Sequence, residues 1–239
     1  MDMKVYRRNC LLGAVGAALM AVGDLCLSII PAGSGDSGLF IREAYLSGEY
    51  QLWRPAVLLV TGLTGMFFYT FGIRVLHDQI LPECKISRAI VKYCGLGFAV
   101  SGAAFHFLIG SLSYWTAYLS PILGREQTIQ TVSDYYDRFV PTMLIVYIPI
   151  VALMLTSLIA LLRNKTIMPR WSAVFHIITW QIILAGIPDI RQIMGFQPAT
   201  TDYMMSQSSG NISVLIWLIA CFFMAGNMRT DIDNRRKEK

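Results

Sequence analysis

The sequence is poor in charged residues for its length. Asp, Glu, Lys and Arg make up 15% of 239 residues, whereas they make up about a quarter of a typical soluble domain. The chain is 55% hydrophobic, with a mean hydropathy of +0.52. Its net charge of +5 does not indicate a nucleic-acid partner, because the charges fall between long apolar runs and form no basic face. The composition excludes a soluble domain and indicates a protein of the lipid bilayer.

Cysteine and histidine are also scarce, with five and three residues. The sequence contains no C-x-x-C, no H-E-x-x-H, no G-x-S-x-G and no glycine-rich phosphate loop. We therefore expect no metal, no cofactor and no structural disulfide. No apolar run carries an arginine ladder, which excludes a voltage sensor. We find no inverted repeat with broken helices, so the usual pattern of a secondary transporter is not supported.

The sequence does contain six long apolar runs. A membrane-spanning helix needs about 20 mostly apolar residues, and these runs lack the alternation of a barrel strand. They predict an all-α, polytopic membrane protein with one six-helix transmembrane domain over residues 1–239. Because proline lacks a backbone donor, the fifth span is expected to stop at Pro188. The predicted spans are 9–30, 56–76, 93–119, 140–162, 171–187 and 211–227.

The basic residues predict the orientation. Fifteen of the 20 Lys and Arg residues lie at the N-terminus, the C-terminus and the two short loops on the same side. Because cytoplasmic segments are enriched in Lys and Arg, both termini are expected in the cytoplasm, with the protein in the plasma or inner membrane. A cleaved signal peptide is the alternative for the first span, but the run exceeds a typical h-region and lacks a small-x-small site. The five remaining basic residues are Arg42, Arg54, Arg125, Arg138 and Arg191.

Three segments on the opposite side, 31–54, 120–139 and 188–210, are each about twenty residues long. They are rich in apolar and aromatic residues, and Ile129, Val132 and Tyr136 recur at helical spacing. We expect short interfacial helices that cap the outer mouth of the bundle. Ordinary aromatic anchoring at the membrane surface is the alternative.

Asp24 is the only acidic residue well inside a predicted span. An ionisable residue at such a position is costly and is by default a functional-site hypothesis. Its helical face carries Gly13, Ala17, Met20 and Ser28, so it is expected to face protein rather than lipid. The alternative is a structural acid that is hydrogen-bonded to a neighbouring helix.

His106 lies at nearly the same depth in the third span, on a face with Gly95, Gly102 and Gly110. Small residues at this spacing let another helix approach closely. We predict that Asp24 and His106 lie within one hydrogen bond or one water of each other and form a catalytic or proton-relay pair. The alternative is a histidine satisfied by a backbone carbonyl or a serine. His176 lies nearer the cytoplasmic end and is not expected to join them.

Five further residues are candidates for ligand binding. Gln181 fits the layer of Asp24, although hydrogen bonding between helices is its more ordinary role. The others lie at the outer ends of spans, where they could line an outward cavity and meet an anionic head group, or serve as ordinary interfacial charges. These are Arg54, Asp189, Arg191 and Asn211.

Four short motifs carry a family resemblance: Gly23-Asp24, Trp53-Arg54-Pro55, Gly102-Ala103-Ala104-Phe105-His106 and Pro169-Arg170-Trp171. With them the chain resembles an uncharacterised group of bacterial six-span membrane proteins, domains of unknown function. That resemblance implies a fold of six helices and does not indicate any particular activity. A fainter likeness is to the membrane hydrolases related to alkaline ceramidases and adiponectin receptors, which use a Ser, an Asp and three His around zinc. Here Ser101 precedes His106 by five positions instead of four, and no late span has a His-x-x-x-His pair.

Three functions fit these observations. The first is a membrane protein with an outward-facing polar cavity that binds or modifies a lipid or other amphiphile. The second is a small proton-coupled transporter in which Asp24 and His106 titrate. The third is a non-catalytic membrane partner, such as an immunity, sensor or assembly protein. The sequence leaves the substrate and the oligomeric state open.

Overall fold

The computed structural model describes residues 2–33, 36, 41–48, 50–197 and 199–237, and for 140–144, 146 and 226–237 the backbone alone. Throughout this part of the chain the regular structure is helical, as predicted, and an isolated bridge joins Ile80 to Thr166. The helices are α1 (Met3–Ser28), α2 (Glu43–Leu46), α3 (Trp53–Gln79), α4 (Lys85–Leu123), α5 (Arg125–Leu162), the 3₁₀ helix η1 (Arg170–Phe175), α6 (Ile177–Ile193) and α7 (Thr200–Lys237).

Five of these segments are long and apolar enough to cross a membrane: α1, α3, α4, the stretch Arg170–Ile193 that contains η1 and α6, and Thr200–Ala225 of α7. The remaining predicted span, 140–162, lies within α5, whose described apolar stretch is the shorter Tyr147–Leu162. The protein is therefore an all-helical chain suited to a membrane, and the sixth span stays a prediction.

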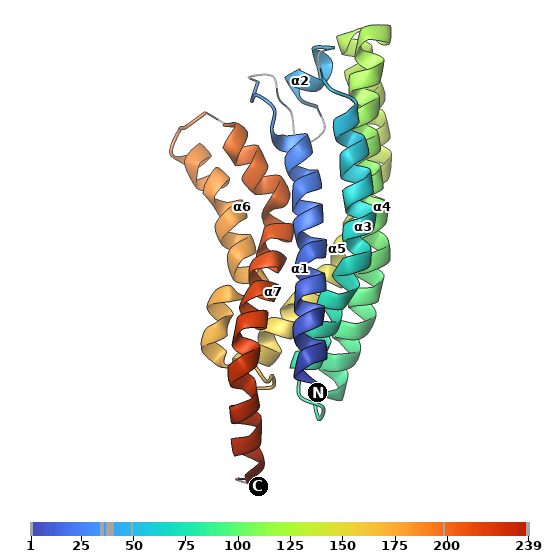
Figure 1. Cartoon of the computed structure of the whole chain (residues 1–239). Helices are drawn as coiled ribbons and strands as arrows, with labels where there is room; N and C mark the ends of the chain where they lie inside the picture. The colour runs from blue at the N-terminus through green and yellow to red at the C-terminus, as the bar shows by residue number, and fades with distance from the viewer. Residues whose placement is uncertain (1, 34–35, 37–40, 49, 198, 238–239) are drawn as a thin grey trace.

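The long helices pack side by side in the order α6, α7, α1, α3 and α4 (Figure 1). The α5 helix packs on α4 and crosses obliquely behind the bundle (Figure 1), so that it meets η1 and α6 near its C-terminal end. We name the end of the bundle that carries α2 the outer end and the opposite end the inner end. The inner half contains the main apolar cluster, to which α1, α3, α4, α5, α6 and α7 all contribute.

Two of the predicted outer loops, 120–139 and 188–210, are largely helical in the structure. The segment 120–139 is not a loop with a separate short helix, because α4 continues to Leu123 and α5 begins at Arg125, after a turn at Gly124 with φ of +79°. At about 1.5 Å per residue, the 39 residues of α4 exceed the roughly 30 Å hydrocarbon layer. The outer ends of α4 and α5 therefore extend past the apolar core as one helical hairpin.

The fifth predicted span also differs from the structure at both ends. It begins as the 3₁₀ helix η1, and a break at His176, with ψ of 148°, separates η1 from α6. The α6 helix does not stop at Pro188 but contains it and continues to Ile193. A proline removes one hydrogen bond without ending a helix when the surrounding structure tolerates the loss. The connection from α6 to α7 is consequently short.

Helices α1 and α3 make the most extensive contact in the bundle. Glycines on both helices bring the two backbones together: a Cβ atom on Gly16 would lie 2.6 Å from the carbonyl oxygen of Gly65, and one on Gly13 would lie 2.7 Å from the Cα of Gly72. No side chain fits at these positions. This pair of helices forms the rigid wall that carries Asp24.

Arginines satisfy the carbonyl groups at the outer end of α1. Arg42 is fully buried, donates to the carbonyls of Ser28, Ile30 and Pro31, and forms an ion pair with Asp36 at 3.3 Å. Its guanidinium also lies 4.1 Å from the centre of the Tyr203 ring. Because the last carbonyls of a helix lack partners within the helix, this arrangement fixes the first outer segment over the end of α1.

Candidate functional site

Asp24 lies in the outer half of α1 and is hydrogen-bonded to the last long helix of the bundle. Asn211 of α7 donates from Nδ2 to Oδ2 of Asp24 at 2.7 Å. The side chain of Asp24 is only 12% exposed, and neighbouring positions of its face, such as Met20 and Ser28, are buried. As predicted, Asp24 faces protein.

His106 approaches Asp24 from α4. Its Nδ1 lies 3.9 Å from Oδ1 of Asp24, and its side chain is 9% exposed. This separation is longer than a direct hydrogen bond of about 2.7–3.2 Å. One bridging polar atom can contact both groups at once. The two side chains are thus neighbours within the span of a single water, with no direct bond between them.

A glycine on α3 makes this approach possible. Helix α3 lies between α1 and α4 in the packing order, and a Cβ on Gly62 would lie 2.8 Å from both Cβ and Cγ of His106. The imidazole therefore passes over the bare backbone of α3. The small residues around His106 pack on the same helix: Gly110 faces the carbonyl of Pro55 and Gly95 faces Ile73. The sequence indicated a close helix approach for this face without identifying α3 as the partner.

The polar group formed by Asp24, His106 and Asn211, which we call the acid–imidazole–amide cluster, draws one residue from each of α1, α4 and α7. Of the five ligand-binding candidates, Asn211 alone contacts Asp24 or His106 in the described residues. Tyr69 of α3 is a further titratable group close enough to interact electrostatically with Asp24. Sequence reasoning missed Tyr69, because an aromatic residue inside an apolar span carries no signal of its own.

The other candidates have different contacts. Gln181 donates to Ser209 at 2.9 Å and joins α6 to α7, its more ordinary role. Arg54 donates to the carbonyls of Cys26 and Ile29 at 2.8 and 3.0 Å, so it caps the end of α1. Arg191 pairs with Asp202 at 3.0 Å and joins the end of α6 to the start of α7. Asp189 is exposed.

His176 forms a buried pair with Ser157 that has the residue types of a nucleophile and its base. Its Nδ1 accepts a hydrogen bond from the backbone N–H of Ile178, so the ring proton is on Nε2. Nε2 then donates to the Ser157 hydroxyl at 3.0 Å, and that hydroxyl donates to the carbonyl of Met154. In this arrangement the histidine donates a hydrogen bond to the serine hydroxyl, whereas a general base would accept one from it. The pair caps α6 and fastens it to α5, and it does not activate the serine.

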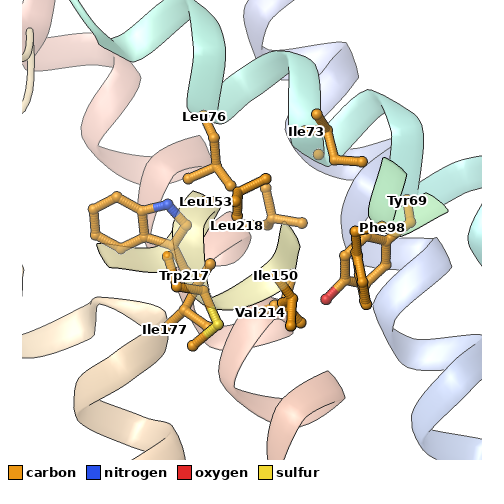
Figure 2. Close-up of a pocket in the computed structure, with 12 residues that line it drawn as sticks. Tyr69, Ile73, Leu76, Phe98, Ile150, Leu153, Ile177, Val214, Trp217 and Leu218 are labelled. Carbon is orange, nitrogen blue, oxygen red and sulfur yellow. The ribbon is translucent and has the colours of Figure 1, made fainter. Parts of the chain in front are cut away.

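Neither of two cavities found in the described structure is lined by Asp24 or His106. The first, of about 20 Å³, lies where α3, α4, α5, α6 and α7 meet. Its wall is apolar and includes Leu153, Trp217 and Leu218, with Tyr69 and Phe98 at one side (Figure 2). That volume holds about one water molecule and excludes an acyl chain.

The second cavity, of about 440 Å³, opens at the outer end and is lined by residues that include Glu43, Tyr50 and Arg54. Arg125 donates to both carboxylate oxygens of Glu43 at 2.5 Å and lowers the pKa of that carboxyl below its usual value. The ion pair connects α2 to the turn between α4 and α5. This cavity is separate from the acid–imidazole–amide cluster, so a polar cavity with Asp24 and His106 at its base stays a prediction.

Within the described residues, no three His, Cys, Asp or Glu side chains are grouped so that they could hold a metal ion. The cluster accordingly offers a carboxylate, an imidazole and an amide, which together can donate, accept and transfer protons. The zinc chemistry of the ceramidase-like hydrolases has no ligand set in this part of the chain.

One comparison with known proteins gave a match. A model of a family of unknown function, DUF6796, matches residues 1–228. No curated protein and no solved structure matches the chain. The resemblance to an uncharacterised family is thereby confirmed, while the bacterial source and the six spans stay predictions.

Proposed function

Because the chain belongs to this family of unknown function, its activity has to be inferred from its own geometry, and we propose that it binds a lipid or other amphiphile in the membrane. The polar head of the ligand would contact the acid–imidazole–amide cluster. The observation that carries the proposal is the meeting of Asp24, His106 and Asn211 from three helices at one depth, with 3.9 Å between the carboxylate and the ring.

Ionisable groups inside a membrane are costly, and structural needs are met more cheaply by neutral side chains. The bond between Asp24 and Asn211 would join α1 to α7 equally well with two amides. A carboxylate beside an imidazole adds the capacity to take up and release a proton. This favours a ligand-binding or proton-transferring role over a purely structural one.

The arrangement of α5 and α6 supports access from the lipid. Their contacts lie toward the inner end, where Ser157 meets His176, whereas at the outer end α5 lies beside α4 and α6 beside α7 (Figure 1). In their outer halves both helices expose apolar side chains such as Phe139 of α5, 41% exposed, and Ile190 of α6, 56% exposed. An acyl chain fits against such surfaces, and we propose that the ligand reaches the cluster between these two helices.

The proposal requires the outer end of the bundle to face away from the cytoplasm, with both termini inside. Single cysteines in place of Ser47 and Ser133 are expected to react with a membrane-impermeant maleimide in intact cells, and a cysteine in place of Lys165 is expected to react only after lysis. The physical basis is the excess of basic residues at the inner end. Labelling of the Lys165 variant from outside would contradict this orientation.

A hydrophobic carbodiimide tests whether the cluster is open to the lipid. Dicyclohexylcarbodiimide enters bilayers and modifies protonated carboxyl groups, so it should add one adduct to the wild-type protein and none to Asp24→Asn. The matched control is Asp189→Asn, which removes an exposed carboxylate and should keep the adduct. Peptide mass spectrometry locates the modification. An unmodified Asp24 would contradict the proposal and favour a non-catalytic partner protein with a bundle packed closed around the acid.

A further inference from the structure

The charges around the acid–imidazole–amide cluster indicate what kind of head group it accepts, and this step rests on the proposed function. Asp24 is the only charged residue in the cluster, and in the described residues no lysine or arginine has an ion pair or hydrogen bond with it. A buried carboxylate without a cationic partner is strongly disfavoured. A cation placed beside Asp24 would therefore stabilise its ionised form.

The arginines nearest the outer end cannot supply that charge. Arg42 is held by Asp36 and three carbonyls, Arg54 by two carbonyls of α1, and Arg191 by Asp202. The same contacts weaken the expectation that these residues meet an anionic head group. A phosphate or carboxylate placed at the cluster would face Asp24 with no described cation to offset the repulsion.

We propose that the ligand is an amphiphile with a primary amine head group, which binds as the ammonium between Asp24 and His106. An ammonium has three donors and no acceptor, so it can donate to the Asp24 carboxylate and, when the ring proton of His106 is on Nε2, to Nδ1 of that ring. Its charge compensates the carboxylate, which a neutral hydroxyl cannot do.

The distances fit a single bridging nitrogen. Oδ1 of Asp24 and Nδ1 of His106 are 3.9 Å apart. A nitrogen about 2.8 Å from both atoms would see them at an angle of about 90°, within the tolerance of two N–H bonds that point about 109° apart. Asn211 holds the other carboxylate oxygen at 2.7 Å and thereby keeps Oδ1 turned toward the ring.

The test compares three amphiphiles of equal chain length on the full-length protein in a non-ionic detergent: dodecylamine, dodecanol and dodecanoate. Binding is measured by native mass spectrometry and by the shift of the melting temperature. We expect dodecylamine to bind at least tenfold more tightly than the other two. Asp24→Asn should weaken dodecylamine binding at least tenfold, while the exposed-site control Asp189→Asn should retain wild-type binding.

Each outcome decides one level of the inference. Binding of dodecanoate or dodecanol as tight as that of dodecylamine, or a dodecylamine affinity unchanged in Asp24→Asn, would overturn the amine assignment but not amphiphile binding. If none of the three amphiphiles binds, both the amine assignment and the proposed binding of an amphiphile are overturned. Ethylamine distinguishes a lipid amine from a small soluble amine as the ligand. If ethylamine binds as tightly as dodecylamine, the assignment of the ligand as an amphiphile is overturned. The melting temperature of Asp24→Asn without ligand verifies that the variant is folded.

Discussion

The Gly16→Ala variant is expected to melt well below the wild-type protein in detergent. The new Cβ would lie 2.6 Å from the carbonyl oxygen of Gly65, 2.7 Å from the backbone nitrogen of Tyr69 and 2.9 Å from the carbonyl carbon of Phe68. These are backbone atoms of α3, so no side-chain rotation relieves the overlap, and α1 must move away. Overpacking of this kind costs about 1–3 kcal/mol of unfolding free energy and occasionally more.

Gly186→Ala is the matched control. Gly186 also lies within a helix, α6, but no atom would lie within 4 Å of its added Cβ. This variant should melt at the wild-type temperature or slightly above, because alanine favours a helix over glycine by about 1 kcal/mol. Equal melting of the two alanine variants would show that α1 and α3 do not make the close backbone contact described above.

The second large effect is expected at Asp24. Asp24→Leu should lower the stability by about 1–3 kcal/mol, because it leaves the part-buried amide of Asn211 without its acceptor. Asp24→Asn should cost less, since an amide oxygen can still accept from Asn211 and the volume is unchanged. Thermal melts followed by circular dichroism measure this. We expect the melting temperature to fall in the order wild type, Asp24→Asn, Asp24→Leu.

A double variant separates the hydrogen bond from the packing. If the bond accounts for the loss, Asn211→Leu combined with Asp24→Leu should cost less than the sum of the single changes, because neither polar group is then left unpaired. Strictly additive costs would contradict the contact between α1 and α7 at this position.

The apolar runs were sufficient to predict an all-helical chain and five of its candidate spans, because length and hydropathy alone determine which segments suit a bilayer. They could not predict the outer ends. The segment after Ser120 is polar enough to resemble a loop, yet α4 and α5 continue there as helices, interrupted only at Gly124. Polar helical hairpins and polar loops have similar compositions. The rule that proline ends a helix predicts a stop at Pro188, but α6 continues through it. A rule based on one residue does not include the tolerance of the surrounding helix.

The neighbourhood of Asp24 and His106 could be predicted only in part. Depth and small-residue faces indicated that the two would be close, and the structure has them 3.9 Å apart. The intermediate position of α3 and the role of Gly62 could not be inferred, because nothing in one sequence identifies which helices are adjacent. The same limit applies to Arg54, Gln181 and Arg191, whose partners lie on other helices or in outer segments.

The bond between Asp24 and Asn211 links residues that are 187 positions apart. Helix α1 is therefore synthesised well before α7, and Asp24 has no Asn211 partner until α7 has been made. Until then the carboxyl group has no Asn211 to hold it, and a chain that ends before α7 never acquires that partner. In a nascent or truncated chain α1 therefore carries this acid without its hydrogen bond to Asn211, which raises the cost of placing α1 in a bilayer.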